Sequence, residues 1–356
     1  MKDLWFDGRF INPTRPDGIT SFSLGLVGEL SRLMPVTVLI NLEAQRDLLP
    51  ESVSVFKVND PTSLRELTLA RRLNQENIGL LVSPMQTTSS LGRNFKLVLT
   101  LHDLIYYRHR TPPKAFSAPV RLGWLLFHLS YFPQRLLLNR ADLVLTVSET
   151  SRREMLEAKL TKRTLAVVHN ASELEIAKPL RPRHDSEYLV YMGSYNRYKN
   201  VEFLIESMAL LPDKTLVLLS RLSDKKRLRL NKLADSVGAK VQFENGVTET
   251  EYLGWLGRAF GLVSASKDEG FGIPLVEAMS QGLPVIVSDI AIFQEVAGNA
   301  GVFFNNSKSE EFVAAVMKLS KEKTWSSHSR KAIEQSAKFS WRRSTKELLA
   351  SLRKIA

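Results

Sequence analysis

Short apolar runs alternate with amphipathic stretches along the first part of the chain. The runs cover residues 36–40, 78–82, 97–101 and 143–147. Each is apolar at successive positions and contains β-branched residues, which is typical of strands buried on both faces of a parallel sheet. Residues 21–33 and 63–74 have helical spacing, and we expect Thr62 to cap the second helix. This alternation favours a doubly wound α/β domain.

A polar stretch broken by prolines separates this series from a second one of the same kind. It reads Lys178-Pro179-Leu180-Arg181-Pro182 at its centre, and we predict an interdomain linker over residues 173–187. The strands predicted after it cover residues 188–192, 215–220, 241–243, 261–264 and 285–288. The helices predicted after it cover residues 202–211, 224–237, 249–259, 274–281, 309–319 and 341–354. Ser340 is predicted to cap the last helix.

The fold class predicted from these two series is α/β, with two Rossmann-like, doubly wound parallel-sheet domains facing a central cleft. The domains span residues 1–172 and 188–338, and residues 339–356 form a C-terminal helix that packs back on the N-terminal domain. Doubly wound sheets bind ligands beyond the carboxyl ends of their strands, so we expect the ligand in the cleft.

Composition narrows the function classes. The chain has 356 residues, of which 44% are apolar and 24% charged, as is ordinary for a soluble protein. It has no cysteine, which excludes a disulfide scaffold, a cysteine zinc site and a thiol nucleophile. Residues 1–7 lack the apolar core of a signal peptide, and no run of about 18 apolar residues predicts a membrane span. We therefore expect a cytoplasmic protein.

Charge is the unusual feature of the composition. Lys and Arg number 49 against 37 Asp and Glu, a formal net charge of +12. Residues 105–140 have no acidic residue, several aromatic ones, and the basic residues Arg108, Arg110, Lys114, Arg121, Arg135 and Arg140. One interpretation is a helix whose aromatic face packs on the core and whose basic face is solvated. The other is an interfacial patch for an anionic membrane, at the inner face of the plasma membrane.

The stretch from Asp268 to Met279 is the most informative for chemistry. It follows a predicted strand and leads into a predicted helix. Gly270 and Gly272 allow a tight turn with close approach of the backbone, and Pro274 suits the first helical position, where its missing N–H is no loss. The unpaired N–H groups at that helix start are suited to hold an anion.

Two acidic residues flank this turn. Glu269 lies on the loop, and Glu277 lies one turn into the helix. Either carboxylate can accept hydrogen bonds from the vicinal hydroxyls of a sugar or a ribose. The alternative is a plain strand–turn–helix corner whose acid interacts with the helix dipole.

The spacing Glu269-x7-Glu277, with Gly-Phe-Gly-Ile-Pro between, resembles the acidic signature of the large retaining glycosyltransferase family 4. Other segments resemble the family in the same order along nearly the whole chain. They are Asp17-Gly18-Ile19, Leu101-His102-Asp103-Leu104, residues 147–152, Val168-His169-Asn170-Ala171, residues 192–200, residues 282–289, residues 295–298 and Phe339-Ser340-Trp341. Agreement over this length is far more specific than one motif.

The resemblance implies the GT-B architecture, with the nucleotide-sugar donor held mainly by the C-terminal domain and the acceptor by the N-terminal one. Lys199 and Arg197 are expected to neutralise the donor diphosphate. Glu277 would hold the ribose hydroxyls, and Glu269 the transferred sugar. The remaining expected donor contacts are the backbone of Phe271, Gly272 and Ile273 around the sugar, and Gly246 and Val247 beside the base.

On the N-terminal domain, Gly18 and His102 are expected to reach the phosphate and the sugar. The resemblance makes His102, Glu269 and Lys199 the candidate catalytic residues. A lone histidine at a strand end is otherwise a structural hydrogen-bonding residue, and Asp103 has the alternative role of capping the next turn.

Three positions depart from the family pattern. Tyr198 separates Arg197 from Lys199 where many relatives have adjacent basic residues. Residues 169–171 replace the usual Pro-Asn-Gly. Arg221 stands where many relatives have a glycine-rich turn, and we therefore regard it as an unorthodox phosphate contact.

The predicted reaction is transfer of a sugar from a UDP- or GDP-sugar to a hydroxyl of a glycan or a lipid-linked acceptor, with retained configuration. Mannose is the sugar expected from the family, in cell-surface polysaccharide or glycolipid synthesis. No cofactor and no metal are expected, because the chain has no Asp-x-Asp and the remaining histidines lack metal-ligand spacing. A sugar-nucleotide epimerase of the same fold is the alternative enzyme. A basic nucleic-acid-binding protein is the alternative from another class, although no recognition motif supports it and we expect no nucleic acid partner.

Overall fold

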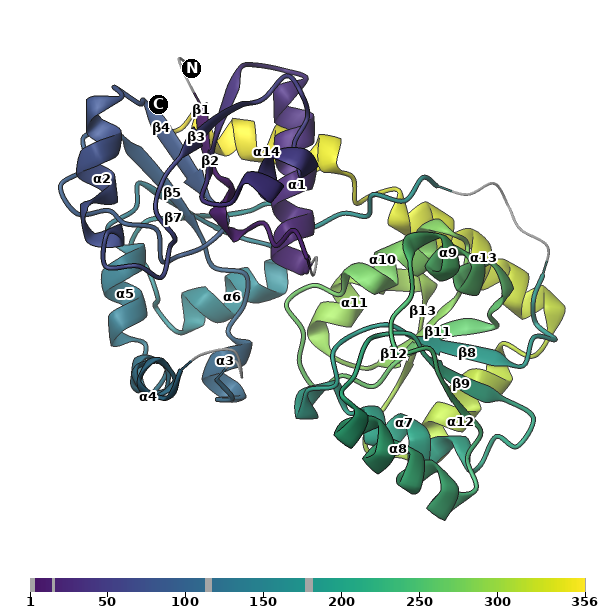
Figure 1. Ribbon diagram of the computed structural model, residues 1–356. Helices are drawn as coiled ribbons and strands as arrows, with labels where there is room; N and C mark the ends of the chain where they lie inside the picture. Colours follow the sequence, from purple (N-terminus) through teal and green to yellow (C-terminus); the bar gives the residue numbers. More distant parts are fainter. Residues whose placement is uncertain (1–3, 15–16, 113–116, 177–181, 356) are drawn as a thin grey trace. The chain divides into compact units, whose positions relative to one another are not determined.

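The computed structural model describes residues 4–14, 17–112, 117–176 and 182–355. The chain divides into two compact units, one made of Met1–Ala171 with Ser340–Ala356 and the other of Ser172–Phe339 (Figure 1). Residues 177–181 of the predicted linker and Lys114 of the predicted basic patch lie outside the described residues.

The first unit is built on a parallel sheet. Its strands, within the described residues, are β1 (Leu4–Asp7), β2 (Val36–Ile40), β3 (Ser54–Lys57), β4 (Leu80–Ser83), β5 (Lys96–Thr100), β6 (Leu143–Thr146) and β7 (Thr164–Val167). They are ordered β3-β2-β1-β4-β5-β6-β7, and every pairing is parallel. The sheet core is almost entirely aliphatic, in agreement with the predicted buried runs.

Helices cover this sheet, and some of them begin at a side-chain cap. They are α1 (Gly18–Ser31), α2 (Glu66–Gln75), α3 (Ile105–Arg108), α4 (Ala118–Phe127), α5 (Phe132–Leu138), α6 (Glu149–Glu157) and α14 (Trp341–Leu352), with 3-10 turns η1 (Gly8–Phe10) and η2 (Glu43–Leu48). The Ser340 hydroxyl accepts a hydrogen bond from the backbone N–H of Arg343, which confirms the predicted cap of α14. The predicted cap at Thr62 is wrong. The carboxylate of Asp60 accepts a hydrogen bond from the Thr62 N–H, in a turn that precedes the helix. Helix α2 begins only after Arg65.

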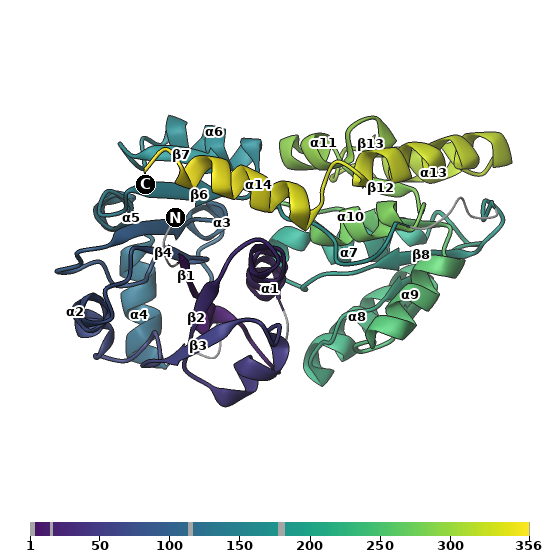
Figure 2. The same cartoon turned by 90° about the horizontal axis from the view of Figure 1, so that it is seen from above.

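Helix α14 returns from the second unit and packs beside α1 (Figure 2). The indole of Trp341 lies on the backbone of Gly25, so that a Cβ at Gly25 would overlap the ring. Phe22 of α1 meets the same ring edge to face, with centroids 6.3 Å apart. The absence of a side chain at Gly25 therefore allows the two helices to approach closely.

The second unit repeats the architecture with a smaller parallel sheet. Its strands, within the described residues, are β8 (Tyr188–Tyr191), β9 (Thr215–Leu218), β10 (Val241–Phe243), β11 (Gly261–Ser264), β12 (Val285–Ser288) and β13 (Gly301–Phe304). They are ordered β10-β9-β8-β11-β12-β13. The helices are α7 (Val201–Met208), α8 (Asp224–Val237), α9 (Glu249–Arg258), α10 (Ile273–Ser280), α11 (Ala291–Ala297), α12 (Ser309–Lys318) and α13 (Glu322–Ser336), with 3-10 turns η3 (Arg197–Lys199) and η4 (Gly298–Ala300).

The basic segment 105–140 differs from the single helix of the first interpretation. It forms α3, α4 and α5, three short helices joined by turns. The exposed side of α4 carries Leu122 and Leu126 in addition to Arg121, the basic residue of this helix. Among the residues that the structure describes, no helix is both long and apolar enough to span a bilayer.

Candidate functional site

The predicted donor residues lie on loops that follow the carboxyl ends of the strands of the second unit. Strands β8 and β11 are neighbours in the sheet, and the chain winds outward from them in opposite directions. This switch point is where doubly wound sheets bind ligands, because the two loops diverge there. Lys199 lies on the loop after β8, and Glu269 lies on the loop after β11. Two residues 70 positions apart are thereby brought to one place.

Lys199 and Glu269 form an ion pair at this switch point. The Nζ atom of Lys199 lies 2.5 Å from Oε1 of Glu269, and the side chains are only 15% and 11% exposed. The hydroxyl of Ser266 donates to the same carboxylate oxygen at 3.0 Å. Because the ammonium and the carboxylate neutralise each other, a bound anion would have to compete with Glu269 for Lys199.

Side-chain amides brace the two loops. Asn200 adopts a left-handed backbone conformation with φ 56°, which asparagine tolerates better than most residues. Its Nδ2 donates to the carbonyl of Asn306 at 2.9 Å, and Asn306 in turn donates to the carbonyl of Ser266 at 3.1 Å. The N–H of Lys267 also donates to the carbonyl of Tyr198 at 2.7 Å. The position of Lys199 is therefore fixed by contacts on both sides.

Helix α10 begins beside this pair. Gly272 precedes it with φ 97°, a conformation that favours glycine, and a Cβ there would meet the ring of Phe293. Ile273 is the first helical residue, so Pro274 lies in the first turn, one position later than predicted. The N–H groups of a first helical turn have no partner within the helix, so this turn can bind an anionic or hydroxylated ligand.

The other expected donor residues differ in exposure. The ring of Phe271 is buried and meets the ring of Phe339 edge to face at 5.4 Å, so the ring is not exposed to a ligand. Arg197 is exposed on the same 3-10 turn as Lys199. The stem of Arg221 lies on Gly246, which has φ 104° and no room for a Cβ. The loops after β9 and β10 therefore meet, and Val247 follows in a partly buried position.

Glu277 lies in the middle of α10 and accepts a hydrogen bond from a residue that the sequence analysis does not identify. The hydroxyl of Tyr252, on α9, donates to Oε2 of Glu277 at 3.0 Å. Burial raises the pKa of Glu277 to about 7, against the lowering effect of the Tyr252 hydrogen bond, and the charges of Glu173 and Glu249 raise it further. The carboxyl group is therefore part protonated and part ionised at neutral pH.

In the first unit, His102 follows strand β5. Its Nε2 lies 2.9 Å from the carbonyl oxygen of Pro84, and its ring meets Phe22 edge to face at 5.2 Å. Burial lowers the pKa of His102, so the ring is neutral at pH 7. We assign the proton to Nε2, which donates to Pro84 and leaves Nδ1 as an acceptor. This is the structural role given above as the alternative, and contact with a sugar stays a prediction.

The neighbouring predicted residues of the first unit lie at helix starts. Gly18 is the first residue of α1, which Asp17 caps by accepting the N–H of Thr20 at 2.9 Å. Asp103 accepts the N–H of Ile105 at 2.9 Å and so caps the turn that opens α3, the alternative role considered for it.

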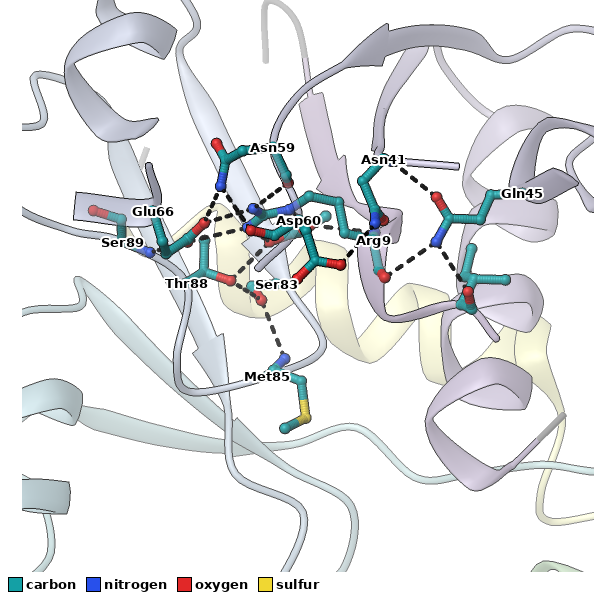
Figure 3. A network of polar contacts seen from close by, with 12 residues as sticks. Arg9, Asn41, Gln45, Asn59, Asp60, Glu66, Ser83, Met85, Thr88 and Ser89 are labelled. Atoms are coloured by element: carbon teal, nitrogen blue, oxygen red, sulfur yellow. Dashed lines mark hydrogen bonds and ion pairs between the residues drawn. The ribbon is translucent and has the colours of Figure 1, made fainter. Parts of the chain in front are cut away.

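A buried ionic network lies at the switch point of the first sheet, where β1 and β4 end (Figure 3). The guanidinium of Arg9 binds both carboxylate oxygens of Asp7 at 2.8 Å and reaches Glu66 at 2.6 Å. Asp7 also accepts the hydroxyl of Thr88 at 2.7 Å, and Glu66 accepts the N–H of Ser89 at 2.9 Å. Burial acts to lower the pKa of Arg9, but the two carboxylates outweigh it and raise that pKa, so the guanidinium stays charged. The network ties the loop after β4 to β1 and α2.

Sequence reasoning missed Tyr252 and this network. Tyr252 has the spacing of an ordinary core residue of α9, and its partner is 25 residues away. Asp7 is the last residue of β1, and Arg9 lies just after it. The sequence analysis does not predict this strand, and its available signal is the acid Asp7 after the apolar residues Leu4, Trp5 and Phe6.

The second unit coincides with a known domain. Residues 172–339 match the family Glycosyl transferases group 1. The match covers the loops that carry Lys199, Glu269 and Glu277.

Curated relatives include bacterial mannosyltransferases. The chain is 27% identical over 244 residues to the O-antigen chain mannosyltransferase RfbU of Salmonella typhimurium, a match that covers 67% of this chain and 64% of the relative. It is 28% identical over 191 residues to the GDP-mannose:cellobiosyl-diphosphopolyprenol alpha-mannosyltransferase of Xanthomonas campestris, half of each chain.

Solved structures share the fold over the whole chain. A sucrose-phosphate synthase from Thermosynechococcus elongatus superposes with a TM-score of 0.78 at 16% identity and covers 100% of this chain and 99% of that one. HepE from Anabaena, in complex with UDP and glucose, gives 0.72 at 18% identity, with 99% of both chains covered. With the two parallel sheets described above, these likenesses confirm the predicted GT-B fold class.

Proposed function

We propose that this protein is a metal-independent retaining glycosyltransferase of family 4. It transfers mannose from GDP-mannose to a hydroxyl of a glycan or a lipid-linked acceptor, in the cytoplasmic steps of cell-surface polysaccharide or glycolipid synthesis. The observation that carries the proposal is the Lys199–Glu269 pair beside the start of α10, at the switch point of a Glycosyl transferases group 1 domain. The choice of mannose is supported by the names of the relatives.

The donor is assigned to the second unit. Lys199 would leave Glu269 to bind the diphosphate, and the freed carboxylate would accept hydrogen bonds from hydroxyls of the sugar. The peptide groups from Phe271 to Ile273 would complete the sugar site. Glu277 would accept the ribose hydroxyls. The further donor contacts are assigned to Arg197 and Arg221 at the phosphates and to Gly246 and Val247 at the base.

Catalysis would consist of positioning and of stabilising the leaving group. The bond between the sugar C1 and the diphosphate oxygen breaks, and the acceptor oxygen bonds to C1 on the same face. The acceptor proton passes to the departing phosphate oxygen, so configuration is retained. The transition state resembles an oxocarbenium ion. Lys199 would stabilise the negative charge that develops on the diphosphate. Gly18 and His102 are assigned to the phosphate and sugar from the first unit.

The proposal is tested by incubating the purified protein with UDP-, GDP- and ADP-sugars, with and without polyprenol-linked or soluble glycan acceptors. We expect release of GDP from GDP-mannose that requires an acceptor, persists in EDTA and yields an α-linked product by NMR. Formation of an isomeric nucleotide sugar without an acceptor would identify the epimerase instead. Absence of turnover together with salt-sensitive binding to nucleic acid would support the third class.

Two substitutions test the assigned residues. Lys199→Ala and Glu277→Ala should each weaken donor binding and lower turnover at least about tenfold, roughly 1.4 kcal/mol. Lys225→Ala on α8 and Glu206→Ala on α7 remove exposed residues of the same types and should keep full activity. Unchanged kinetics in the folded Lys199 and Glu277 variants would refute the two assignments.

A further inference from the structure

Helix α4 exposes its apolar side to solvent. Trp124 is on the packed side, where its ring stacks on His128 with centroids 3.9 Å apart and meets Tyr106 at 5.2 Å. Leu122 and Leu126 are one turn apart on the opposite side, and each is 59% exposed. This arrangement reverses the usual amphipathic helix, in which the leucines face the core.

The apolar side continues along the chain into α5. Leu129, in the turn between the helices, is 59% exposed, and Phe132 and Leu136, one turn apart on α5, are 63% and 50% exposed. Gln134 and Leu138 occupy the buried side of α5. We call Leu122, Leu126, Leu129, Phe132 and Leu136 the apolar strip. Within each helix the exposed apolar residues are one turn apart, and contiguous exposed apolar surface of this kind normally marks a surface that binds a partner.

The surroundings of the apolar strip carry positive charge. Residues 105–140 contain no acidic residue, and Arg121 and Arg140 are exposed. Arg135 is held in place by hydrogen bonds to the carbonyls of Ala158 and Lys159. A surface that carries leucine, phenylalanine and arginine suits a partner that has an apolar interior and an anionic boundary.

The net positive charge of the chain is divided unequally between the two units. The first unit has 27 Lys and Arg against 16 Asp and Glu, a formal charge of +11. The second unit has 22 against 21, a formal charge of +1. Nearly all of the net charge of +12 therefore belongs to the unit that carries the apolar strip, which favours an anionic partner for that unit.

We propose that the apolar strip inserts into the headgroup region of an anionic phospholipid bilayer, with the neighbouring arginines on lipid phosphates. Leucine and phenylalanine partition into the boundary between headgroups and acyl chains, and arginine binds phosphate. A second copy of the chain is a poorer occupant, because a two-fold contact through this surface would bring like charges together. The inference does not depend on the proposed glycosyl transfer, since membrane binding is measured without donor or acceptor.

The first test is sedimentation with vesicles of phosphatidylcholine alone and of phosphatidylcholine with about 30% phosphatidylglycerol. We expect binding to the anionic vesicles at least about tenfold tighter than to the neutral ones. Part of this binding should remain at 0.5 M salt, where the Debye length falls to roughly 4–5 Å, because salt screens the charge attraction and not the apolar contribution. Negligible binding to both vesicle types at low salt would overturn the proposal.

Paired variants separate insertion from plain charge attraction. Leu122→Gln/Leu126→Gln should weaken binding to anionic vesicles at least about tenfold. The control Leu210→Gln/Leu228→Gln replaces leucines of the second unit that are 52% and 59% exposed, and it should bind like the parent protein. Circular dichroism checks that both remain folded. Equal binding by the two double variants would overturn insertion.

The absence of native cysteine allows a site-specific probe. An environment-sensitive fluorophore on Leu126→Cys should shift to the blue on anionic vesicles, whereas the same label on Leu228→Cys should not. Light scattering without lipid measures whether the protein forms a dimer, which tests a second copy of the chain as the alternative partner of this surface. A dimer that the Leu122→Gln/Leu126→Gln substitutions dissociate would replace the membrane by a second copy of the chain.

Discussion

The carboxyl group of Glu277 illustrates how a single residue is set by its surroundings. It is half-buried and packs against α9, with the hydroxyl of Tyr252 as hydrogen-bond donor. Burial outweighs that donor and raises the pKa from the ordinary 4.5 to about 7. The unfolded chain therefore loses this proton at lower pH than the folded protein does, and ionisation of Glu277 opposes folding.

This gives a prediction for stability. Between pH 5 and pH 8 the free energy of unfolding of the parent protein should fall relative to that of Glu277→Gln, which cannot ionise. A pKa difference of about 2.5 units corresponds to about 3 kcal/mol at the upper end of this range. Urea unfolding of both proteins at each pH measures it. The interpretation fails if the two proteins show the same pH dependence.

Individual residues of the candidate site can be predicted from the sequence only where they belong to a recognisable motif. Lys199, Glu269 and Glu277 were identified from segments that resemble a family, and the structure brings Lys199 and Glu269 into contact. Tyr252 has no such signal, because its role depends on a partner on another helix. Pairing across elements is a property of the packed fold and is not visible in local spacing.

At the scale of elements, helix α1 contains two glycines that have the same helical context and different surroundings. Gly25 lies beneath the indole of Trp341, whereas an added Cβ at Gly28 would have no atom within 4 Å. The same substitution should therefore have opposite effects at the two positions.

We predict that Gly25→Ala destabilises the protein by about 1–3 kcal/mol through overpacking against Trp341. Gly28→Ala should stabilise it by up to about 1 kcal/mol, because alanine is the better helix former. Thermal or urea unfolding of the two variants measures the difference. A stabilising Gly25→Ala would mean that α14 does not hold this contact in solution.

The strands that the sequence did not predict have a common physical cause in three of four cases. β3, β7 and β13 lie at sheet edges and are less buried than the central strands. β1 is central, but it is short and ends in the buried acid Asp7. The helix α4 shows a different limit: periodicity reveals an apolar side without telling whether that side faces the core.

At the scale of the whole molecule, each unit has its own sheet and core. The Arg9 network belongs to the first unit alone and satisfies a guanidinium that is out of reach of water. Removing one partner of such a buried network leaves uncompensated charge, at a typical cost of about 3–5 kcal/mol.

We predict that Arg9→Met increases hydrogen exchange in peptides from β1, β4 and α2. Peptides from residues 172–339 should keep their protection, because the second unit does not use this network. Exchange measured by mass spectrometry on the whole chain tests this. An equal rise in both units would show that they unfold as one.

The path of the chain has a consequence for biosynthesis. The second unit is inserted between β7 and α14, so the ribosome makes all of it before the helix that completes the first unit. Until Trp341 emerges, the face of α1 around Phe22 and Gly25 stays uncovered on the nascent chain. The half of the protein that is begun first is thus finished last, and this face of α1 is where a chaperone would bind in the interval.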